Sequence, residues 1–193
     1  MEHKPEVTHH ESRSTADTSA DAVILVDADD RVIGTMPKLE AHRRGVLHRA
    51  VSVFVRDGGN RLLLQQRTIR KYHSGGLWTN TCCSHPRPGE GAAEAAARRL
   101  VEEMGFACSL TFLFPMQYFA QVSNGLIEHE LVHVFSGRFD GAPDPNPYEV
   151  MAWCWRRPAE IAKGVEERPQ DYTVWFQKYC REYWHVLCGN DCR

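Results

Sequence analysis

The stretch WTNTCCSHPRPGE, from Trp78 to Glu90, places two adjacent cysteines, Cys82 and Cys83, just before His85. A thiol and an imidazole at this spacing could bind a metal, belong to a disulfide framework, act as a nucleophile or simply pack. The chain has seven cysteines, an odd number, and no CxxC pair. The N-terminus has no apolar signal segment, so we expect reduced thiols in a cytoplasmic protein.

Three histidines and two glutamates form a second candidate set. His42 and His48 lie in LEAHRRGVLHRAVS, His85 lies in CCSHP, and Glu128 and Glu130 lie in IEHELVHV. Alternation puts both carboxylates on one face of a strand with valines, which is costly unless a cation or a shared proton compensates. A solvent-facing pair on an edge strand explains the same stretch equally well. Brought together by a fold, these nitrogen and oxygen donors would suit Mn²⁺, Fe²⁺ or Zn²⁺.

A helix predicted over residues 90–106 carries paired charges. Arg98 and Glu102 are four residues apart, as are Arg99 and Glu103, so each pair shares a face of the helix. Simple salt bridges are the usual outcome of this spacing. Carboxylates in the last turn oppose the helix dipole unless a cation compensates. Mg²⁺ could do so, because it binds through one or two carboxylates together with substrate phosphates.

The elements that must position these side chains are strands and helices in one domain. Two strand–turn–strand units are predicted over residues 22–36 and 50–67, and further strands over 126–139 and 149–156. Alanines and a closing glycine predict the helix at 90–106, Pro158 opens a short helix, and apolar residues three and four apart predict an amphipathic helix over 171–187. This order indicates an α+β domain with a mixed sheet.

Composition and charge limit the possible partners. The chain has 193 residues, 42% apolar residues and a formal net charge of −2, which fits one globular domain without a basic footprint for nucleic acid or an anionic membrane. The longest apolar runs are too short to span a bilayer. We expect a disordered polar tail at residues 1–20 and a C-terminal tail at 189–193.

The charged helix belongs to a longer frame that combines Glu90, Arg98-Arg99-Leu100, Glu102-Glu103 and Gly105-Phe106. This frame resembles the Nudix box, a loop–helix–loop that binds a metal and a diphosphate. Nudix hydrolases have Arg-Glu where this chain has Arg98-Arg99, and glycine where it has Ser84. The missing carboxylate weakens a hydrolase assignment, and the basic Arg99 favours diphosphate binding without hydrolysis.

Three stretches, KLEAHRRGVLHRAVSVFV, GLWTNTCCSHPRPGE and GLIEHELVHVF, resemble the signatures of the type 1 isopentenyl-diphosphate delta-isomerases. The resemblance runs from about Val23 to Trp175. That family interconverts isopentenyl and dimethylallyl diphosphate. The resemblance implies a single Nudix-fold domain over residues 21–188, with a mixed β-sheet sandwiched between α-helices. It also implies a small-molecule substrate, no nucleic acid and no membrane partner; a monomer is favoured.

The resemblance also implies roles for individual residues. The implied catalytic residues are Cys83, Glu130 and Tyr118; the implied substrate-binding residues are Lys38, Arg67, Lys71, Arg99 and Trp175; the implied metal ligands are His42, His48, His85, Glu128, Glu130 and, for Mg²⁺ with the diphosphate, Glu103. A further divalent ion, Mn²⁺ or Zn²⁺, is expected at the histidines. On this basis we expect Glu130, assisted by Tyr118, to protonate the alkene and Cys83, as thiolate, to remove a proton from the opposite face.

Two other functions compete with this interpretation. A Nudix diphosphate hydrolase would use the same helix without needing Cys83 or the histidines. A structural zinc module would use Cys82, Cys83, His85 and a C-terminal cysteine, although adjacent cysteines rarely make a good tetrahedral pair. We expect Cys82 to pack as a small apolar side chain. The sequence assigns no role to Cys180, Cys188 and Cys192.

Overall fold

The computed structural model describes residues 21–188, so the tails expected at 1–20 and 189–193 lie outside the described residues. The strands are β1 (Ala22–Val26), β2 (Val32–Pro37), β3 (His48–Arg56), β4 (Leu62–Arg67), β5 (Trp78–Thr79), β6 (Cys82–Ser84), β7 (Leu110–Gln121), β8 (Ile127–Arg138) and β9 (Val150–Arg156). The helices are α1 (Lys38–Arg44), α2 (Ala92–Met104), η2 (Ser123–Gly125), α3 (Pro158–Glu167), η3 (Pro169–Asp171), α4 (Val174–Glu182) and α5 (Trp184–Cys188).

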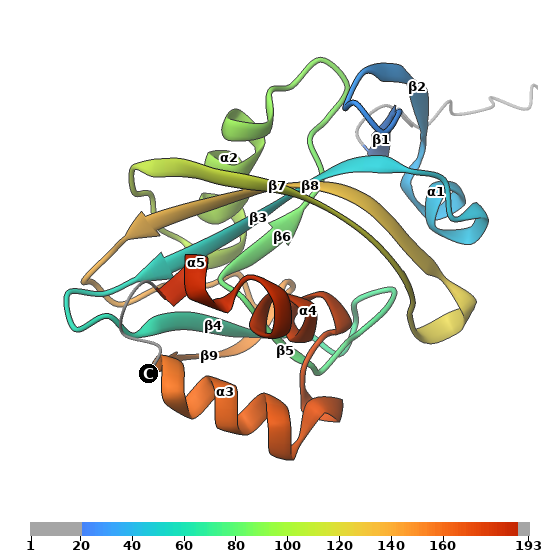
Figure 1. Ribbon diagram of the computed structural model, residues 1–193. Coiled ribbons are helices and arrows are strands. Elements are labelled where there is room, and N and C mark those ends of the chain that lie inside the picture. The colour runs from blue at the N-terminus through green and yellow to red at the C-terminus, as the bar shows by residue number, and fades with distance from the viewer. Residues whose placement is uncertain (1–20, 189–193) are drawn as a thin grey trace, which may run out of the picture.

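Strand β3 pairs with β1, β4, β6 and β8 and so joins the parts of the sheet (Figure 1). It runs parallel to β8 and antiparallel to β6, and β8 pairs in turn with β7. The expected unit over 50–67 forms, but β3 and β4 pair only at Arg56 and Leu62, because β6 takes the place beside β3 and β4 pairs with β9 instead. The sheet is therefore mixed, as predicted.

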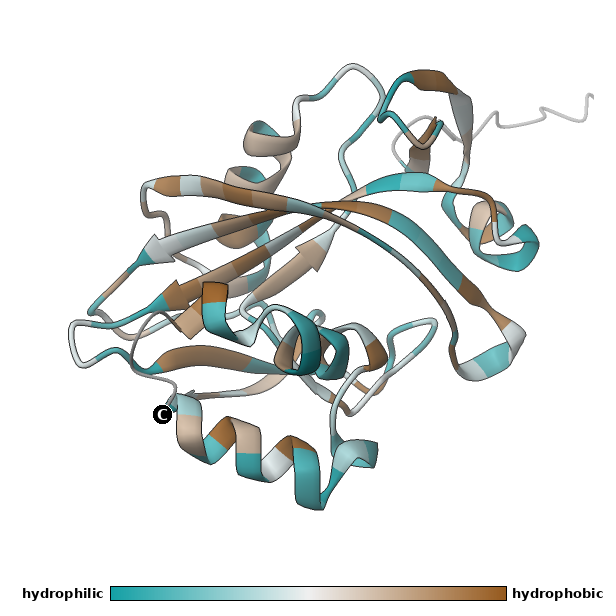
Figure 2. Ribbon diagram, in the orientation of Figure 1, coloured by the Kyte–Doolittle hydropathy of each residue, from teal (hydrophilic) through white to brown (hydrophobic). Residues whose placement is uncertain are grey.

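Alternate residues of β3 face two separate cores. Ala50 and Phe54 pack with α3, α4 and α5, whereas Val51, Val53 and Val55 pack with the apolar side of α2. Hydrophobic residues accordingly run along the strands between the two groups of helices (Figure 2). This period of two is what a strand buried on both faces requires. The sheet is sandwiched between helices, as the resemblance implied.

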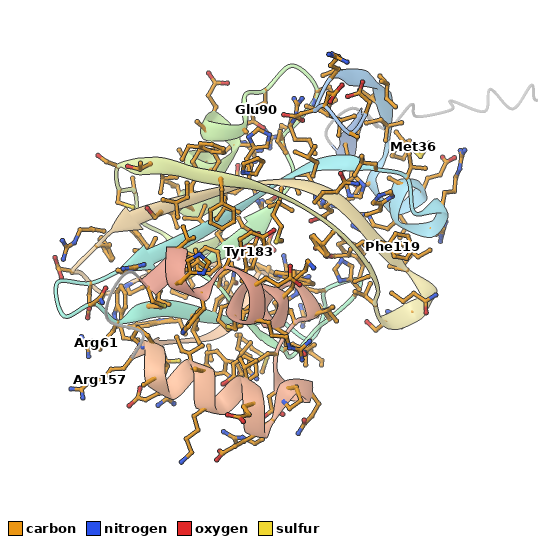
Figure 3. All side chains as sticks on the ribbon, viewed as in Figure 1. Met36, Arg61, Glu90, Phe119, Arg157 and Tyr183 are labelled. Carbon is orange, nitrogen blue, oxygen red and sulfur yellow. The ribbon has the colours of Figure 1, made fainter. Side chains whose placement is uncertain are left out.

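The C-terminal amphipathic segment is broken into two helices. The expected helix over 171–187 begins only at Val174, and α4 gives way to α5 at Tyr183, whose ring stacks on Phe114 of β7 with 4.8 Å between centroids (Figure 3). Tyr172 precedes the helix because it forms an isolated bridge with Trp78. The break lets both helices cover the same side of the sheet.

The strand β7 has no counterpart among the expected elements. Its sequence contains Pro115, which cannot donate to a ladder and is typical of edge strands. In the structure β7 pairs with β8 alone, with a bulge between Phe112 and Phe114, so this edge position tolerates the proline. The position of β7 makes β8 an interior strand of the sheet.

Candidate active site

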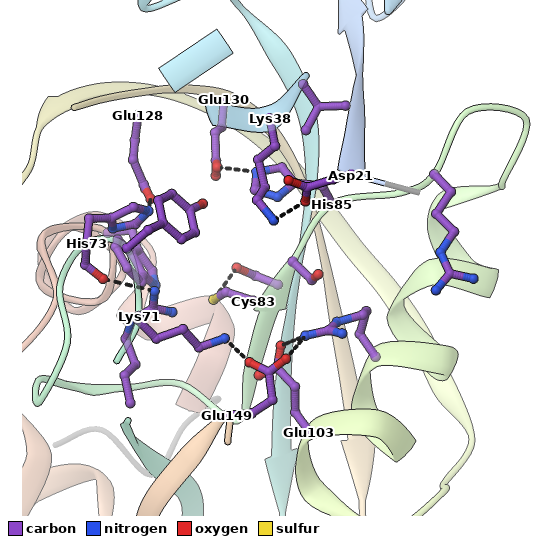
Figure 4. A pocket seen from close by; sticks show the side chains of 18 of the residues that line it. Asp21, Lys38, Lys71, His73, Cys83, His85, Glu103, Glu128, Glu130 and Glu149 are labelled. Carbon is purple, nitrogen blue, oxygen red and sulfur yellow. Dashed lines mark hydrogen bonds and ion pairs between the residues drawn. The ribbon is translucent and has the colours of Figure 1, made fainter. Parts of the chain in front are cut away.

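A cavity of about 420 Å³ extends from residues of α4 to residues of α2 (Figure 4). It is lined by eleven of the thirteen residues predicted for the site: Lys38, Arg67, Lys71, Cys83, His85, Arg99, Glu103, Tyr118, Glu128, Glu130 and Trp175. The other two, His42 and His48, are completely buried. Segments that are distant in the sequence therefore converge on one hollow.

Strand register aligns three of these residues. His48 on β3 is the register partner of Glu130 on β8, and Glu130 is in turn the partner of Tyr118 on β7. The Tyr118 hydroxyl oxygen lies 3.1 Å from Glu130 Oε2, although its single hydrogen is donated to Glu128, which is nearer. Both carboxylates are buried, Glu128 at 4% and Glu130 at 7% exposure, on an interior strand. The solvent-facing alternative for this pair is therefore wrong.

Three imidazoles surround the Glu130 carboxylate. His42 Nδ1 donates to Lys38 O and His48 Nδ1 to Val46 O, both at 2.8 Å, so in the neutral rings each Nε2 carries a lone pair that can bind a metal. The Tyr72 hydroxyl lies 3.4 Å from His42 Nε2, so a metal there would replace this weak contact. The Nε2 atoms of His42, His48 and His85 lie 4.0, 3.6 and 2.8 Å from Glu130 Oε1.

The His48 Nε2 atom has no hydrogen-bond partner among residues 21–188. The four ligand atoms of His42, His48, His85 and Glu130 lie within 4.8 Å of one another, so this group fits a divalent metal. A buried nitrogen without a partner is costly unless something binds it, which supports the same conclusion.

The charge states of His42, His85 and Glu130 suit metal binding, whereas His48, whose pKa is raised, would more often have to lose a proton to bind a metal. Burial lowers the pKa of His42 and of His85 to about 4, so both rings are neutral at pH 7. Burial would raise the pKa of Glu130, but the neighbouring His48 and His85 hold it well below its usual range. For His48 the Glu130 carboxylate outweighs burial and raises the pKa. The result is an anionic carboxylate among imidazole donors.

Glu128 belongs to a different group from the other expected ligands. It accepts hydrogen bonds from the Tyr118 hydroxyl and, at 3.0 Å, from His73 Nε2. His42, His73 and Glu128 form a second set whose ligand atoms lie within 4.8 Å of one another. The structure thus brings together four of the five ligands expected for the Mn²⁺ or Zn²⁺ ion: His42, His48, His85 and Glu130. It also adds His73, which the sequence reasoning missed although His73 stands in KYHSGG, two residues after Lys71.

The two adjacent cysteines face opposite sides of the sheet. Cys82 is completely buried against the α2 core, whereas Cys83 lines the cavity beside Ser52, its register partner on β3. The Cys83 thiol donates to Asn80 Oδ1 at 3.0 Å and lies 3.2 Å from Ser52 Oγ. Because the pair diverges, Cys82 and Cys83 cannot ligate one zinc ion. No disulfide joins the cysteines of residues 21–188.

The protonation of Cys83 follows from its surroundings. Burial raises the pKa of the thiol to about 12, in spite of Ser52 and Asn80, which lower it. Asn80 Nδ2 donates to Val53 O and Cys82 O, so the acceptor Oδ1 is the end that faces the thiol. These pKa shifts favour a protonated Cys83 thiol and an ionised Glu130 carboxylate in the metal-free protein.

Basic side chains gather at the α2 end of the cavity. Arg99 bonds Glu103 at 2.6 Å and Glu149 at 3.1 Å, and Lys71 also pairs with Glu149. Glu103 is 1% exposed and also accepts from Gln65 at 3.0 Å. The sequence reasoning missed Glu149, because a single glutamate at the start of a strand carries no local signal.

The aromatic wall of the cavity comes from α4. Trp175 is 3% exposed, and its Nε1 has no hydrogen-bond partner among the described residues. The Arg67 guanidinium lies 5.2 Å from the centroid of the indole ring. Arg67 itself donates to the backbone carbonyls of His73 and Ser74, both at 3.2 Å. The indole and the guanidinium thus lie side by side in one wall of the cavity.

Comparisons with known proteins agree with this geometry. Residues 46–176 match the model of the NUDIX domain family. The chain is 54% identical to isopentenyl-diphosphate Delta-isomerase of Burkholderia multivorans over 80% of this chain and 88% of that protein. It is 48% identical to the enzyme of that name from Pectobacterium atrosepticum over 89% of this chain and 97% of that protein. The chain belongs to the isopentenyl-diphosphate Delta-isomerase family, within the Nudix superfamily.

Solved structures support the fold of this isomerase-family chain. DR0079 from Deinococcus radiodurans superposes with a TM-score of 0.72 at 19% identity, covering 88% of this chain and 99% of that one. A MutT protein from Methanosarcina mazei gives a TM-score of 0.60 at 17% identity, covering 72% and 94%. At such identities the likeness concerns the fold alone, and it confirms the expected Nudix architecture.

Arg99 gives the α2 helix of this isomerase-family chain a positive charge beside two carboxylates. Position 99 carries a guanidinium that neutralises Glu103 and Glu149, where a Nudix hydrolase would carry another carboxylate. Burial would lower the pKa of Arg99, but the Glu103 carboxylate raises it, so the cation is permanent. Within residues 21–188, no helix combines the length and the apolar character that crossing a membrane requires.

Proposed function

We propose that this chain interconverts isopentenyl diphosphate and dimethylallyl diphosphate by moving a proton onto one carbon and off another. The observation that carries the proposal is that Cys83 on β6 and Glu130 on β8 reach the same cavity from different strands (Figure 4). An allylic shift needs two acid/base groups on opposite sides of a flat alkene, and this pair supplies them. The names of the relatives agree with the proposal.

The diphosphate would occupy the basic end of the cavity. Lys71 and Arg99 lie there and are already oriented by Glu149. Lys38 and Arg67 line other parts of the same cavity, Lys38 over Tyr72 and Arg67 beside Trp175. Glu103 would hold a Mg²⁺ ion with the diphosphate, since Mg²⁺ binds through few carboxylates plus phosphate oxygens. Anchoring the charged end positions the small hydrocarbon end between Cys83 and Glu130.

One transferable proton serves the Cys83–Glu130 pair. Protonation of the terminal methylene carbon gives a tertiary cation at the neighbouring carbon. Loss of a proton from the CH₂ group between this cationic carbon and the CH₂–O group of the diphosphate completes the shift. The resemblance puts the first proton on Glu130, whereas in the structure the pKa values put it on Cys83. If Glu130 is the donor, the proton must first move from the Cys83 thiol to the Glu130 carboxylate. If Cys83 is the donor, no such transfer is needed. The reaction is reversible, so both states belong to the cycle.

The environment of Glu130 favours proton transfer at its carboxylate. The hydroxyl of Tyr118 lies 3.1 Å from one oxygen of Glu130, Oε2, whereas His85 contacts the other oxygen, Oε1. A Mn²⁺ or Zn²⁺ ion held by His42, His48, His85 and Glu130 would act as a Lewis acid that fixes the charge and orientation of this carboxylate. Tyr118 would then position the remaining oxygen toward the substrate.

The hydrocarbon end would lie against Trp175. An indole face stabilises a desolvated cation by about 2 kcal/mol. Trp175 is buried with Phe176 and Tyr179 on α4, so water is kept from this wall of the cavity. The aromatic wall and the basic end thus match the two halves of an isoprenoid diphosphate.

One experiment tests the proposed function directly. The purified protein is incubated with isopentenyl diphosphate, Mg²⁺ and Mn²⁺ in D₂O, and the substrate and product are followed by NMR. We expect dimethylallyl diphosphate carrying deuterium in a methyl group, without release of inorganic phosphate. Phosphate release without double-bond migration would instead establish the Nudix hydrolase alternative.

A further inference from the structure

The loop between β4 and β5 closes over the histidine–glutamate groups. Gly76 N donates to Arg67 O and Arg67 N donates to Leu77 O, both at 3.0 Å, so the loop ends are joined. A Cβ on Gly75 would lie 2.7 Å from Ile69 O, and Gly76 has a φ of +80°, so both glycines are required by the turn. This turn fixes the position of His73, which is 2% exposed.

His73 makes two side-chain hydrogen bonds that determine its tautomer. Its Nε2 lies 3.0 Å from Glu128 Oε1, and its Nδ1 lies 3.1 Å from Ser74 Oγ. An ionised carboxylate can only accept, so Nε2 carries the hydrogen and donates it to Glu128. In the neutral ring Nδ1 then accepts the hydroxyl hydrogen of Ser74. The imidazole is therefore oriented as a donor toward Glu128.

The geometry argues against His73 as a ligand of a second ion. His42 is shared by both groups of donors, but its Nδ1 bonds Lys38 O, so it has one lone pair, at Nε2, and can serve one ion. That ion would be held by His42 with His48, His85 and Glu130, a group to which His73 does not belong. His73 and Glu128 alone are too few ligands for an ion of their own.

We propose that His73 is a positioning residue that holds the Glu128 carboxylate beside the metal group. Glu128 is linked to that group through the Tyr118 hydroxyl, which bonds Glu128 and lies 3.1 Å from Glu130 Oε2. This inference rests on the metal site of the proposed function. Glu128 Oε1 accepts from His73 and Oε2 accepts from Tyr118, so both oxygens are oriented and the carboxylate cannot rotate freely. Residues that hydrogen-bond the side chains at a metal site in this way, as His73 and Tyr118 do here, tune the affinity of the site for the ion.

The same histidine couples the metal group to the substrate surface. Its backbone carbonyl accepts from Arg67 at 3.2 Å, and its ring meets Trp175 edge-on with 6.0 Å between centroids. Ser74 N donates to Ser123 Oγ at 2.9 Å, which ties the loop to the connection between β7 and β8. Replacing the imidazole leaves the two backbone contacts in place but removes the ring contact with Trp175 as well as the donor to Glu128. A variant that restores only the donor therefore separates the two effects.

The test compares His73→Leu with His73→Gln in the full chain, without substrate. The dissociation constant of Mn²⁺ is measured by chelator competition, and the fold is checked by near-UV circular dichroism after metal removal. We expect weakening of about 10- to 100-fold for His73→Leu. His73→Gln should bind within a few-fold of wild type, because the amide Nε2–H reaches the position of the imidazole Nε2–H. His185→Leu, a change at an exposed histidine of α5, is the matched control.

Either of two results would overturn the inference. Wild-type Mn²⁺ affinity in a folded His73→Leu protein would show that the donor does not support the site. Equal weakening in His73→Leu and His73→Gln would show that the imidazole binds the ion itself. Because the readout is metal affinity, a protein that binds Mn²⁺ as expected and fails to isomerise substrate would refute the proposed function alone.

Discussion

Cys82 and Cys83 are neighbours in β6 and lie on opposite faces of the sheet. Cys82 packs against the α2 core with Val53, its register partner on β3, whereas Cys83 pairs in register with Ser52 and opens into the cavity. Strand alternation alone produces this division. The double cysteine is therefore neither a redox pair nor half of a zinc site, and its two members must respond differently to the same substitution.

Cys83→Ala should abolish most turnover and Cys82→Ala should not. Removing an acid/base group costs about 10²–10⁴-fold in rate. Cys82→Ala removes a buried sulfur from the α2 core and should cost about 1 kcal/mol of unfolding free energy with near-normal kcat. Steady-state isomerase assays and urea titrations measure the two effects. Normal turnover in Cys83→Ala together with loss in Cys82→Ala would reverse the assignment.

Deuterium exchange can identify which residue serves the terminal methylene carbon. In D₂O, a variant that keeps the acid/base group beside the terminal methylene carbon can add a deuteron to this carbon and then remove a proton from it. The recovered substrate then carries deuterium although it has not isomerised. If Glu130 is that group, Cys83→Ala exchanges and Glu130→Gln does not. Protonation by Cys83, the arrangement that the pKa values favour, predicts the opposite pattern. NMR of recovered substrate in D₂O distinguishes the two, and exchange in neither variant would contradict both assignments.

Local patterns in the sequence predicted most of the elements that position the site. Alternation in IEHELVHV correctly placed Glu128 and Glu130 on one face of a strand, but it left open whether that face is buried. Gly105 correctly ended α2, where it adopts the left-handed conformation. These features depend on residues that are near in sequence. The roles of the site residues came from motif resemblance and stay predictions.

Contacts between distant segments could not be predicted in the same way. His73 meets Glu128 only because the β4–β5 loop folds back over β8, and Glu149 meets Arg99 across fifty residues of chain. The strand β7 was missed because Pro115 argues against a strand until its edge position is known. Each of these depends on tertiary structure, about which a single sequence without an alignment says little.

Arg99→Met should destabilise the fold more than Arg98→Met. Arg99 neutralises Glu103, which is 1% exposed, so its removal leaves a buried charge, at a cost of about 3 kcal/mol. Arg98 pairs with Glu90 and Glu102, which are more exposed and can be solvated, so its loss should cost less. Chemical denaturation of both variants gives the comparison, and equal losses would show that burial of Glu103 is not decisive.

The metal-free protein should lose stability as the pH falls from about 6.5 toward 4. The pKa of both His42 and His85 is lowered from 6.5 to about 4 in the fold, so in this window the unfolded chain binds protons that the native state does not. Each histidine contributes at most about 1.4 kcal/mol per pH unit. Glu130, whose pKa is lowered, adds to the loss below about pH 4.5.

The other histidine of the group acts in the opposite direction. The raised pKa of His48 gives stability that is fully present below 6.5 and is lost as the pH rises through its folded value. His48 therefore lowers stability above pH 6.5 and adds nothing to the slope between pH 6.5 and 4. Urea unfolding of chelator-treated protein at several pH values measures the net effect. His85→Asn should flatten the dependence, and an unchanged slope in that variant would exclude His85 as a source.

Trp175→Leu should lower kcat with little change in KM. Lys71 and Arg99, which would bind the diphosphate in the ground state, lie at the α2 end of the cavity, whereas the indole would act on positive charge that exists only after protonation of the alkene. Arg67 lies 5.2 Å from the indole centroid, but the backbone carbonyls of His73 and Ser74 keep it in place. A lost cation–π contribution of about 2 kcal/mol corresponds to roughly 30-fold in rate. Trp155→Leu is a suitable control, because Trp155 on β9 packs against the α2 core on the opposite face. A rise in KM at constant kcat would instead place Trp175 in ground-state binding, and the matched control separates either outcome from a general loss of packing.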